Sequence, residues 1–352
     1  MGKTAKEKLR VCLLLFSIIA VAAQAGSNPY QAGSNPYTDM VGEVFVSPRS
    51  AAMSRADLAI NPSGSLVSNP AVIALPALSQ LSLSYASYFH DVFSTSIMNY
   101  NGSVGTNGGL GVSAAYLLVP GIEDTRAVDT SGIDTDNIDL FTSSDVWVRI
   151  GYGRRYEAEK FAFYYGAALN ARRRRLELET AHGLGMDAGV MLHLPEQSLY
   201  FSLLLENVKS SFVRWSGADY VEHGLPHLRF SAAFERDFPY VYGSLALVFT
   251  SPDLLSNEGI NDVEEDVYYR DDQGKPIIVK YTERPSLVLA NGRYGLEYTI
   301  MNTFSLRAGF SQSDFSLGAG LNLLEERAGL DFSYLNHQLA ATYKMSVTYR
   351  WH

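Results

Sequence analysis

The strongest constraint on this chain is an alternation of apolar and polar residues with a period of two. The last segment that shows it, residues 343–351, has Tyr, Met, Val, Tyr and Trp on one parity and Lys, Ser, Thr and Arg on the other. Successive side chains of a β-strand point to opposite faces of its sheet, so this segment is predicted to be a strand with one apolar face. The same alternation recurs at 160–170, 226–236, 303–311, 313–323 and 327–336.

A soluble β-sandwich would show the same alternation, but two properties of the segments favour a barrel that spans a membrane. Segments of about ten residues are longer than most strands of soluble sheets and match a tilted strand that crosses a bilayer. Their non-apolar faces carry Gly, Ser and isolated Arg, which suit a crowded polar lumen better than a solvated outer face. Because an open sheet edge cannot remain unpaired in lipid, we predict an all-β fold whose strands close into a transmembrane antiparallel barrel.

The connections predict the number of strands and the orientation of the barrel. Candidate strands lie near 79–89, 92–103, 106–118, 144–156, 160–173, 183–193, 199–208, 226–236, 240–251, 290–300, 303–311, 313–323, 327–336 and 340–351. Their number, about 14, is even, as bacterial single-chain barrels require. The long connections all fall on the same side, at 119–143, 174–182, 209–225 and 252–289. We therefore expect a barrel domain over 78–352 in a cell outer membrane of the Gram-negative type, with both termini periplasmic.

Residues 1–25 are predicted to be a secretory signal peptide. Four basic residues precede an apolar run over 11–23, and the small residues that end at position 25 fit a cleavage site. The apolar run is shorter than a membrane-spanning helix, which argues against the alternative of an uncleaved anchor. The single cysteine, Cys12, lies within this run, so the exported chain is expected to have no disulfide and no cysteine-ligated metal.

Residues 26–77, between this peptide and the first strand, carry features of a known family. A run rich in small residues at 51–60 is followed by two Asn-Pro turns, and SNPAVIAL at 68–75 precedes the first aromatic strand. In this order the features resemble the opening of the FadL-like outer-membrane barrels. The segment LLLENVKSS at 203–211 and the run RAGFSQSDFSLGAG at 307–320 are similar to the PorV/PorQ type within that group.

The resemblance implies a segment inside the barrel and two alternative functions. FadL-like barrels have an N-terminal hatch, so 26–77 is expected to be a periplasmic segment whose later part plugs the lumen. Its turns would be formed by Asn61, Pro62, Asn69, Pro70 and Ala71. FadL-like barrels imply passive transport of hydrophobic or amphipathic small molecules across the outer membrane. The PorV-like alternative implies an accessory barrel of the type IX protein secretion system, which interacts with other proteins.

Within the predicted barrel, the alternation points several charged side chains toward the lumen. These are Arg149, Arg229, Glu235, Arg307 and Arg350. An arginine on the lipid face at the bilayer midplane costs about 2–4 kcal/mol, which supports the inward assignment. We expect Arg149 and Arg307 to bond to Asn, Ser and backbone carbonyl groups of the plug, because a buried charge needs partners.

The run RRRR at 172–175 is predicted at the outer rim of the barrel. Alternation points Arg173 and Arg175 outward, where they would contact the phosphates of lipopolysaccharide, since arginine binds phosphate with two hydrogen bonds. The alternative is a solvated rim neutralised by Glu177 and Glu179. Both interpretations remain open on the sequence.

Three glycines open the third predicted strand: Gly108, Gly109 and Gly111. Glycine weakens strand pairing and permits a bulge or a kink. In FadL-like transporters a kink in the third strand opens a side path from the lumen to the bilayer, so the resemblance implies a strand kink here. The alternative is ordinary barrel curvature, which also uses glycine.

Residues for catalysis or cofactor binding form no recognisable pattern. The seven histidines are scattered without the spacing of a metal site or a catalytic triad, and Asp134, Asp136 and Asp139 miss the spacing of a calcium loop. A net charge of −9 argues against nucleic acid as a partner. We therefore expect no enzyme activity, no cofactor and no metal. The expected partners are outer-membrane lipid and, by resemblance, hydrophobic small molecules or secretion-system proteins.

Overall fold

The computed structural model describes the barrel strands and two stretches of the N-terminal segment. The described residues are 44–60, 68–75, 79–124, 139–208, 211–217, 221–255, 281, 285–312, 314–337 and 340–351. The predicted signal peptide, the turn at Asn61 and Pro62, and the acids Asp134 and Asp136 lie outside them.

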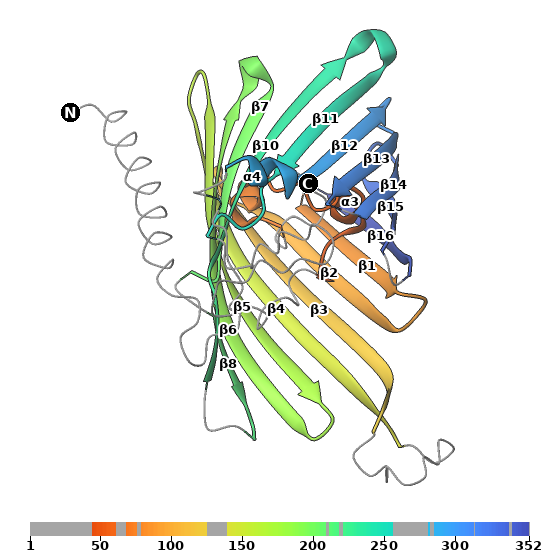
Figure 1. Cartoon of the computed structure of the whole chain (residues 1–352). Helices are drawn as coiled ribbons and strands as arrows, with labels where there is room; N and C mark the ends of the chain where they lie inside the picture. Colours follow the sequence, from red (N-terminus) through yellow and green to blue (C-terminus); the bar gives the residue numbers. More distant parts are fainter. Residues whose placement is uncertain are drawn as a thin grey trace, which may run out of the picture.

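Fourteen antiparallel strands form a closed barrel, as the alternation predicts (Figure 1). All 16 strands of the described residues belong to one sheet, but β8 and β9 form a hairpin that only extends its wall. Strand β7 pairs with β10 beside this hairpin, and β1 pairs with β16 to close the ring. The strands are β1 (Ser79–Tyr88), β2 (Phe93–Val104), β3 (Gly108–Glu123), β4 (Leu140–Glu157), β5 (Ala162–Leu176), β6 (Glu179–Leu194), β7 (Leu199–Glu206), β8 (Ser211–Trp215), β9 (Val221–Gly224), β10 (His227–Phe238), β11 (Gly243–Thr250), β12 (Arg293–Ile300), β13 (Phe304–Ser311), β14 (Asp314–Leu323), β15 (Ala328–Leu335) and β16 (Thr342–Trp351).

Two of the predicted long loops are wrong, because strand pairing extends beyond the apolar pattern. Strands β5 and β6 continue through the predicted loop 174–182 and meet in a tight turn at Glu177, whose φ is 51°. The predicted loop 209–225 contains the β8–β9 hairpin. Charged residues suggested a loop in the sequence, but Arg174 of β5 pairs with Asp145 of β4 across the sheet and belongs to a strand.

The barrel wall is taller on one side than on the other. Strands β3 to β6 have 16, 18, 15 and 16 residues, whereas β12, β13 and β15 have 8 residues each. In Figure 1 the long strands, drawn in yellow and green, extend well below the blue strands and carry β8 at their far end. Short helices occupy three connections: η4 (Pro195–Gln197), η5 (Pro239–Val241) and α4 (Ser286–Ala290).

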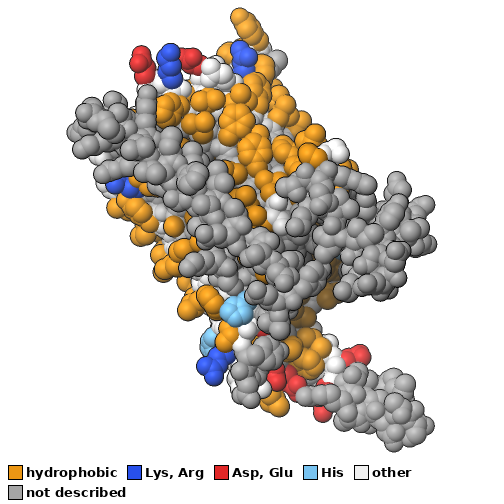
Figure 2. Space-filling view, turned by 60° about the vertical axis from the view of Figure 1, so that its left-hand side comes forward, with side chains coloured by type: hydrophobic (Ala, Val, Ile, Leu, Met, Phe, Trp, Pro, Cys, Tyr) orange, Lys and Arg blue, Asp and Glu red, His pale blue; other side chains and the backbone are white. Residues whose placement is uncertain are grey.

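Exposure alternates along the strands and separates a lumen face from an outer face. On β1, Ser82 is 2% exposed and Leu83 is 55% exposed; on β16, Thr348 is 1% exposed and Val347 is 57% exposed. The outward side chains are mainly apolar, and in Figure 2 they form a broad hydrophobic surface between two ends that carry charge. Contact with bilayer lipid requires such an outer band. None of the helices in the described residues is long and apolar enough to cross a membrane.

The N-terminal segment forms two short helices, and a side chain just before each helix caps its first turn. Helix α3 (Pro48–Ala52) follows Ser47, whose side chain caps its first turn. The 3-10 helix η2 (Pro70–Ala74) follows Asn69, whose Oδ1 accepts a hydrogen bond from the amide of Ala71 at 2.9 Å. Each helix begins with proline, which is favoured there because it has no N–H group to leave unpaired.

Candidate functional site: the N-terminal segment and its seats in the barrel

The N-terminal segment, residues 44–60 and 68–75, lies inside the barrel against inward-facing side chains. The ring of Phe45 stacks on that of Trp147 of β4, with 5.8 Å between ring centroids. A second buried cluster joins the segment to β10 and β11; it contains Met53, Ala56, Ala59, Ile60, Ala233, Ala246 and Val248. With further contacts of α3, η2 and their flanks, the segment reaches the inner face of all fourteen barrel strands.

A row of glycines across β3, β4, β5 and β6 makes room for η2. The members lie directly opposite one another in strand register: Gly109, Gly153, Gly166 and Gly189. A Cβ atom added at Gly153 would lie 3.0 Å from Pro70 O, and one added at Gly166 would overlap that carbonyl group. A Cβ atom added at Gly189 would overlap the side-chain oxygen of Asn69. The segment therefore packs directly on the sheet backbone, a separation that only glycine permits.

A second pair of glycines accommodates the turn after α3. Gly295 of β12 and Gly309 of β13 lie directly opposite each other, and a Cβ atom added at Gly295 would lie 2.8 Å from Met53 Cβ. A Cβ atom added at Gly309 would lie 2.5 Å from the carbonyl carbon of Met53. Beside them, Ser316 Oγ of β14 accepts a hydrogen bond from the backbone amide of Ser54 at 3.2 Å, and the hydroxyl oxygens of the two serines lie 3.0 Å apart. Close packing and this serine pair hold the turn against the wall.

Asn69 connects both described stretches of the segment to the wall. It is fully buried, and its Nδ2 donates to Leu58 O at 3.1 Å and to Ser202 Oγ of β7 at 2.6 Å. Its Oδ1 accepts the amide of Ala71, so the oxygen and the amide nitrogen of the side chain are both bonded, as burial requires. The predicted turn residues Pro70 and Ala71 are also buried, in the first turn of η2.

An ionic network links α3 to three strands of the wall. Arg49 donates to the carboxylate of Glu297 on β12, from Nε at 2.8 Å and from Nη2 at 2.6 Å. Arg307 of β13 donates to the same carboxylate and, through Nη1, to Asp331 Oδ1 of β15 at 2.7 Å. The four side chains are only 6% to 13% exposed. Charges that leave water need such pairing, and each hydrogen bond between ionised groups is stronger than a neutral one.

The prediction that the wall arginines bond to the N-terminal segment is wrong for Arg307, because neighbouring strands supply its carboxylates. Arg149 likewise has a wall carboxylate as partner: its Nη2 donates to Asp187 Oδ2 of β6 at 2.5 Å. The carboxylate of Asp187 also accepts hydrogen bonds from Asn170 Nδ2 at 2.8 Å and from the backbone amide of Asn207 at 2.8 Å. Alternation identifies the face of the sheet that a side chain occupies, whereas pairing across strands decides its partner.

The other charged residues predicted to face the lumen lie on the inward parity of their strands. Arg229 is 4% exposed, and its Nη1 lies 3.3 Å from Glu206 Oε2 of β7. Glu235 lies further along β10, where the lumen wall becomes exposed. Arg350 donates to the backbone oxygen of Glu326 at 2.8 Å, in the turn between β14 and β15.

Asp57 is a buried acid of the N-terminal segment. It is 1% exposed; its Oδ1 accepts Ser50 Oγ at 2.6 Å, while its Oδ2 accepts no hydrogen bond from the described residues. Burial raises the pKa of this carboxyl, against the opposing effects of the Ser50 hydrogen bond and the charge of Arg49. The packed segment therefore favours the protonated acid.

The glycines predicted to kink the third strand pair regularly with both neighbouring strands. Gly108, Gly109 and Gly111 continue the ladders to β2 and β4 without a shift in register. The shift in β3 lies between Val119 and Ile122. At Gly109 an added Cβ atom would overlap the carbonyl group of Ile73, so contact with η2 is one reason for glycine here. A side path at this strand stays a prediction.

The outward arginines of the RRRR run lie at the far end of β5. Arg173 and Arg175 are exposed, and Arg175 Nε donates to the backbone oxygen of Glu177 at 3.3 Å. Glu179 lies on the inward parity of β6, so its position does not neutralise Arg173. Contact of these arginines with lipopolysaccharide stays a prediction.

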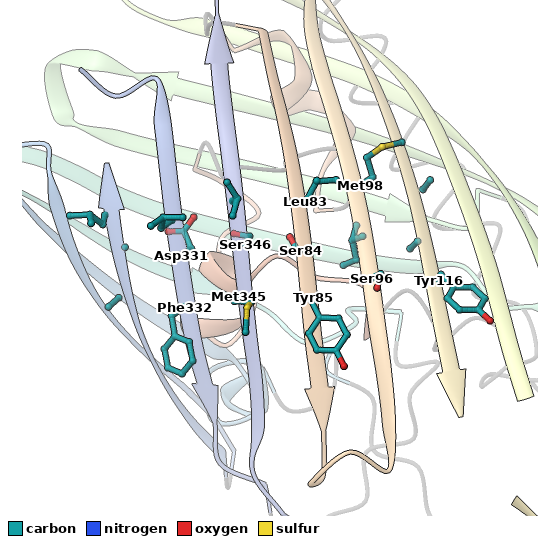
Figure 3. A pocket seen from close by; sticks show the side chains of 18 of the residues that line it. Leu83, Ser84, Tyr85, Ser96, Met98, Tyr116, Asp331, Phe332, Met345 and Ser346 are labelled. Carbon is teal, nitrogen blue, oxygen red and sulfur yellow. The ribbon is translucent and has the colours of Figure 1, made fainter. Parts of the chain in front are cut away.

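An apolar groove of 880 Å³ lies on the outer face of the wall rather than in the lumen. Figure 3 shows Tyr85, Met345 and Phe332 pointing to the same side from the neighbouring strands β1, β16 and β15. Their side chains are 46%, 57% and 44% exposed and belong to the outward parity. A second groove, over β10 to β13, is also lined by outward residues such as Leu247 and Phe310. In a bilayer such grooves would hold lipid acyl chains.

No group of three or more His, Cys, Asp or Glu side chains within the described residues is arranged to hold a metal ion. His227 and Asp253 form a pair that stabilises the local fold, with 3.1 Å between Nδ1 and Oδ2. Asp253 also accepts the amides of Leu228 at 2.8 Å and Leu255 at 3.1 Å. The aspartate thereby fastens the chain after β11 to the start of β10.

The barrel fold of the chain has counterparts among solved structures. The toluene transporter TodX of Pseudomonas putida is 13% identical to this chain, and the match covers 86% of this chain and 96% of that chain with a TM-score of 0.50. The chain shares its barrel fold with this transporter. A deltaS2 mutant of the TodX monoaromatic hydrocarbon channel is 12% identical, with 89% and 100% of the two chains covered and a TM-score of 0.50. No family model and no curated protein matches the chain.

Two groups of residues that hold the N-terminal segment do not stand out in the sequence. The four glycines of the row are spread over 109–189, and only their shared inward parity on consecutive strands would reveal them. Arg49 and Glu297 are 248 positions apart, and no local pattern connects them.

Proposed function

We propose that this protein is an outer-membrane barrel for passive transport of hydrophobic or amphipathic small molecules, and that residues 44–60 and 68–75 are a plug that closes its lumen. The glycine row carries the proposal, because the wall lacks side chains at four facing positions where a separate segment of the chain lies. A barrel filled by its own side chains would need no such segment. The fold shared with a toluene transporter supports transport rather than enzymatic activity.

The proposed orientation follows from the two ends of the barrel. Strand β1 begins beside the end of β16, with Ser79 opposite Trp351. In our proposal this end faces the periplasm, and the end with the long connections faces outward. The outward apolar band and the shared fold support a location in the outer membrane.

The contacts of the plug are compatible with its movement inside an intact barrel. Hydrogen bonds, ion pairs such as that of Arg49 with Glu297, and close packing on glycine hold it. The only cysteine of the sequence is Cys12, so no disulfide ties the plug to the wall. The β-ladders of the barrel do not include the plug, and strand pairing can persist when the plug shifts.

A reversible crosslink tests this function. The hydroxyl oxygens of Ser54 and Ser316 lie 3.0 Å apart, so cysteines at the two positions are placed to form a disulfide. In cells that lack their own transporter, uptake of toluene or a fatty acid should stop in the oxidised Ser54→Cys/Ser316→Cys variant and recover after reduction. Each single-cysteine variant is a matched control and should transport in both conditions. Unchanged uptake through a barrel whose crosslink is verified by mass spectrometry would contradict the proposal.

The PorV-like alternative is an interaction barrel of the type IX secretion system. The feature that favours it is the β8–β9 hairpin, which extends the tall wall and offers a surface to another protein. Under this alternative, deletion of 211–224 would impair export of cargo proteins, and the wild-type chain would not raise uptake of hydrophobic compounds. Under the transport proposal the same deletion leaves uptake intact.

A further inference from the structure

The outer face of the tall wall carries a row of basic side chains at the end of the barrel that bears the β8–β9 hairpin. Arg173 of β5 lies directly opposite His182 of β6, and His182 lies opposite Arg214 of β8. All three are exposed and point outward. Neighbouring strands are about 4.8 Å apart, so the two arginines are separated by about 10 Å. Figure 2 shows basic and histidine side chains at the lower left of the face that it presents, with acidic side chains to their right.

The next outward row toward the middle of the barrel is apolar. Ala171, Leu184 and Phe212 lie opposite one another in the same register. Leu184 is 66% exposed and Phe212 is 50% exposed. The surface changes from apolar to cationic within two residues, or about 7 Å along a strand. A lipid fits both rows, because its acyl chains pack on the apolar row and an anionic head group meets the cationic row.

The cationic row has no acidic partner within the part of the chain that the structure describes. Arg173 and Arg214 form no ion pair there, whereas the inward-facing Arg174 is bound by both oxygens of Asp145. The positive charges of Arg173 and Arg214 lie on the same face of the sheet, two strands apart, and repel each other. A bound anion would remove this repulsion.

We propose that Arg173, His182 and Arg214 bind the phosphate groups of lipid A in the outer leaflet. Arginine binds phosphate through paired N–H donors, and two arginines about 10 Å apart suit a head group with two phosphates. Arg175, on the same face of β5, adds a further cation beyond the row. The proposal depends on the outer-membrane setting but not on transport, because the row lies on the lipid side of the wall.

Binding of lipid A to the purified full-length protein, measured by native mass spectrometry in detergent, tests the proposal. The variant Arg173→Gln/Arg214→Gln should bind lipid A about 10- to 30-fold more weakly than the wild type. The matched control is Arg154→Gln, which changes an exposed outward arginine at the other end of β4 and should leave binding unchanged. Lipid A without its phosphates should bind the wild type as weakly as lipid A binds the double variant.

Three results would overturn the assignment. The first is equal binding of lipid A by the double variant and the wild type, with both shown to be folded by their heat-dependent gel mobility. The second is binding of phosphatidylglycerol as tightly as lipid A, which would make the row a general phospholipid site. The third is complete displacement of lipid A by millimolar inorganic phosphate, which would make it a site for the free anion.

Discussion

Gly189 of β6 leaves the space that the side chain of Asn69 occupies: a Cβ atom added at Gly189 would overlap Asn69 Oδ1. The wall thus omits a side chain where the capping residue of η2 docks. Asn69 also donates to Leu58 O and to Ser202 Oγ, so its position sets both stretches of the plug relative to β7. A change at either Gly189 or Asn69 should therefore loosen the plug and leave the strand pairing of the barrel intact.

The substitution Gly189→Ala should displace Asn69 and speed hydrogen exchange of the amides in 68–75, because overpacking costs about 1–3 kcal/mol. Gly185→Ala is the matched control on the same inward face of β6, since the nearest neighbours of its added Cβ atom, Asn207 Oδ1 and Ser211 Cβ at 3.3 Å, do not belong to the plug. Exchange measured by mass spectrometry should be near wild type in the control. Equal exchange rates in the two variants would show that the glycine row does not seat the plug.

The substitution Asn69→Ala should loosen the plug more than Ser202→Ala does. The first removes three hydrogen bonds, at about 0.5–1.5 kcal/mol each, and the second removes one. Protease sensitivity of residues 44–75 reports the loosening, and the gel mobility of unheated protein reports an intact barrel. The interpretation fails if the two variants are equally sensitive, because Asn69 would then act only through Ser202.

The substitution Glu297→Ala should destabilise the plug more than Arg49→Ala. Loss of Glu297 removes the carboxylate that Arg49 and Arg307 share, and breaking a buried ion pair costs about 3–5 kcal/mol. Loss of Arg49 leaves Glu297 paired with Arg307. In a double-mutant cycle followed by urea titration, Arg49→Ala should have little further effect when Glu297 is already absent. Additive effects would mean that the two residues act independently.

The packing of the plug should weaken as pH rises, because burial raises the pKa of Asp57. Below the unfolded pKa of about 3.9, the Asp57 carboxyl is protonated in both the folded and the unfolded state, so burying it requires no loss of charge and the packed state is favoured. As pH rises through the higher folded pKa, ionisation of the buried acid disfavours packing. The open probability of single channels should therefore increase over this range, and Asp57→Asn should flatten the dependence. A wild-type open probability that falls as pH rises would contradict this sign.

The barrel could be predicted from the sequence because its main signal is local. The alternation on Tyr343 to Trp351 and on similar segments identifies strands, and an even number of strands with apolar outer faces must close in lipid. The same signal failed at Arg174, where charge suggested a loop although Asp145 on the next strand neutralises it. A local sequence pattern does not identify the partner of a side chain on a neighbouring strand.

The contacts between the plug and the barrel wall could be predicted only in part. Asn69 and Pro70 stand out as a turn before the first strand, and the structure places them against the wall. The glycines opposite them are informative only once β3 to β6 are aligned in register, because Gly153 and Gly166 alone are consistent with barrel curvature. The partner of Arg49 depends on how the segment folds back into the lumen, which no short pattern determines.

Single-channel conductance of the full-length protein and of a variant lacking residues 46–70, recorded in planar bilayers, tests most directly whether the N-terminal segment closes the lumen. The deletion removes α3, Asn69 and the contacts of Arg49 while leaving every barrel strand in place. We predict that the full-length protein is closed or weakly conducting and that the variant forms a larger and noisier pore. A variant that inserts as a folded barrel and stays as closed as the full-length protein would show that the wall side chains fill the lumen themselves, and the plug account would be wrong.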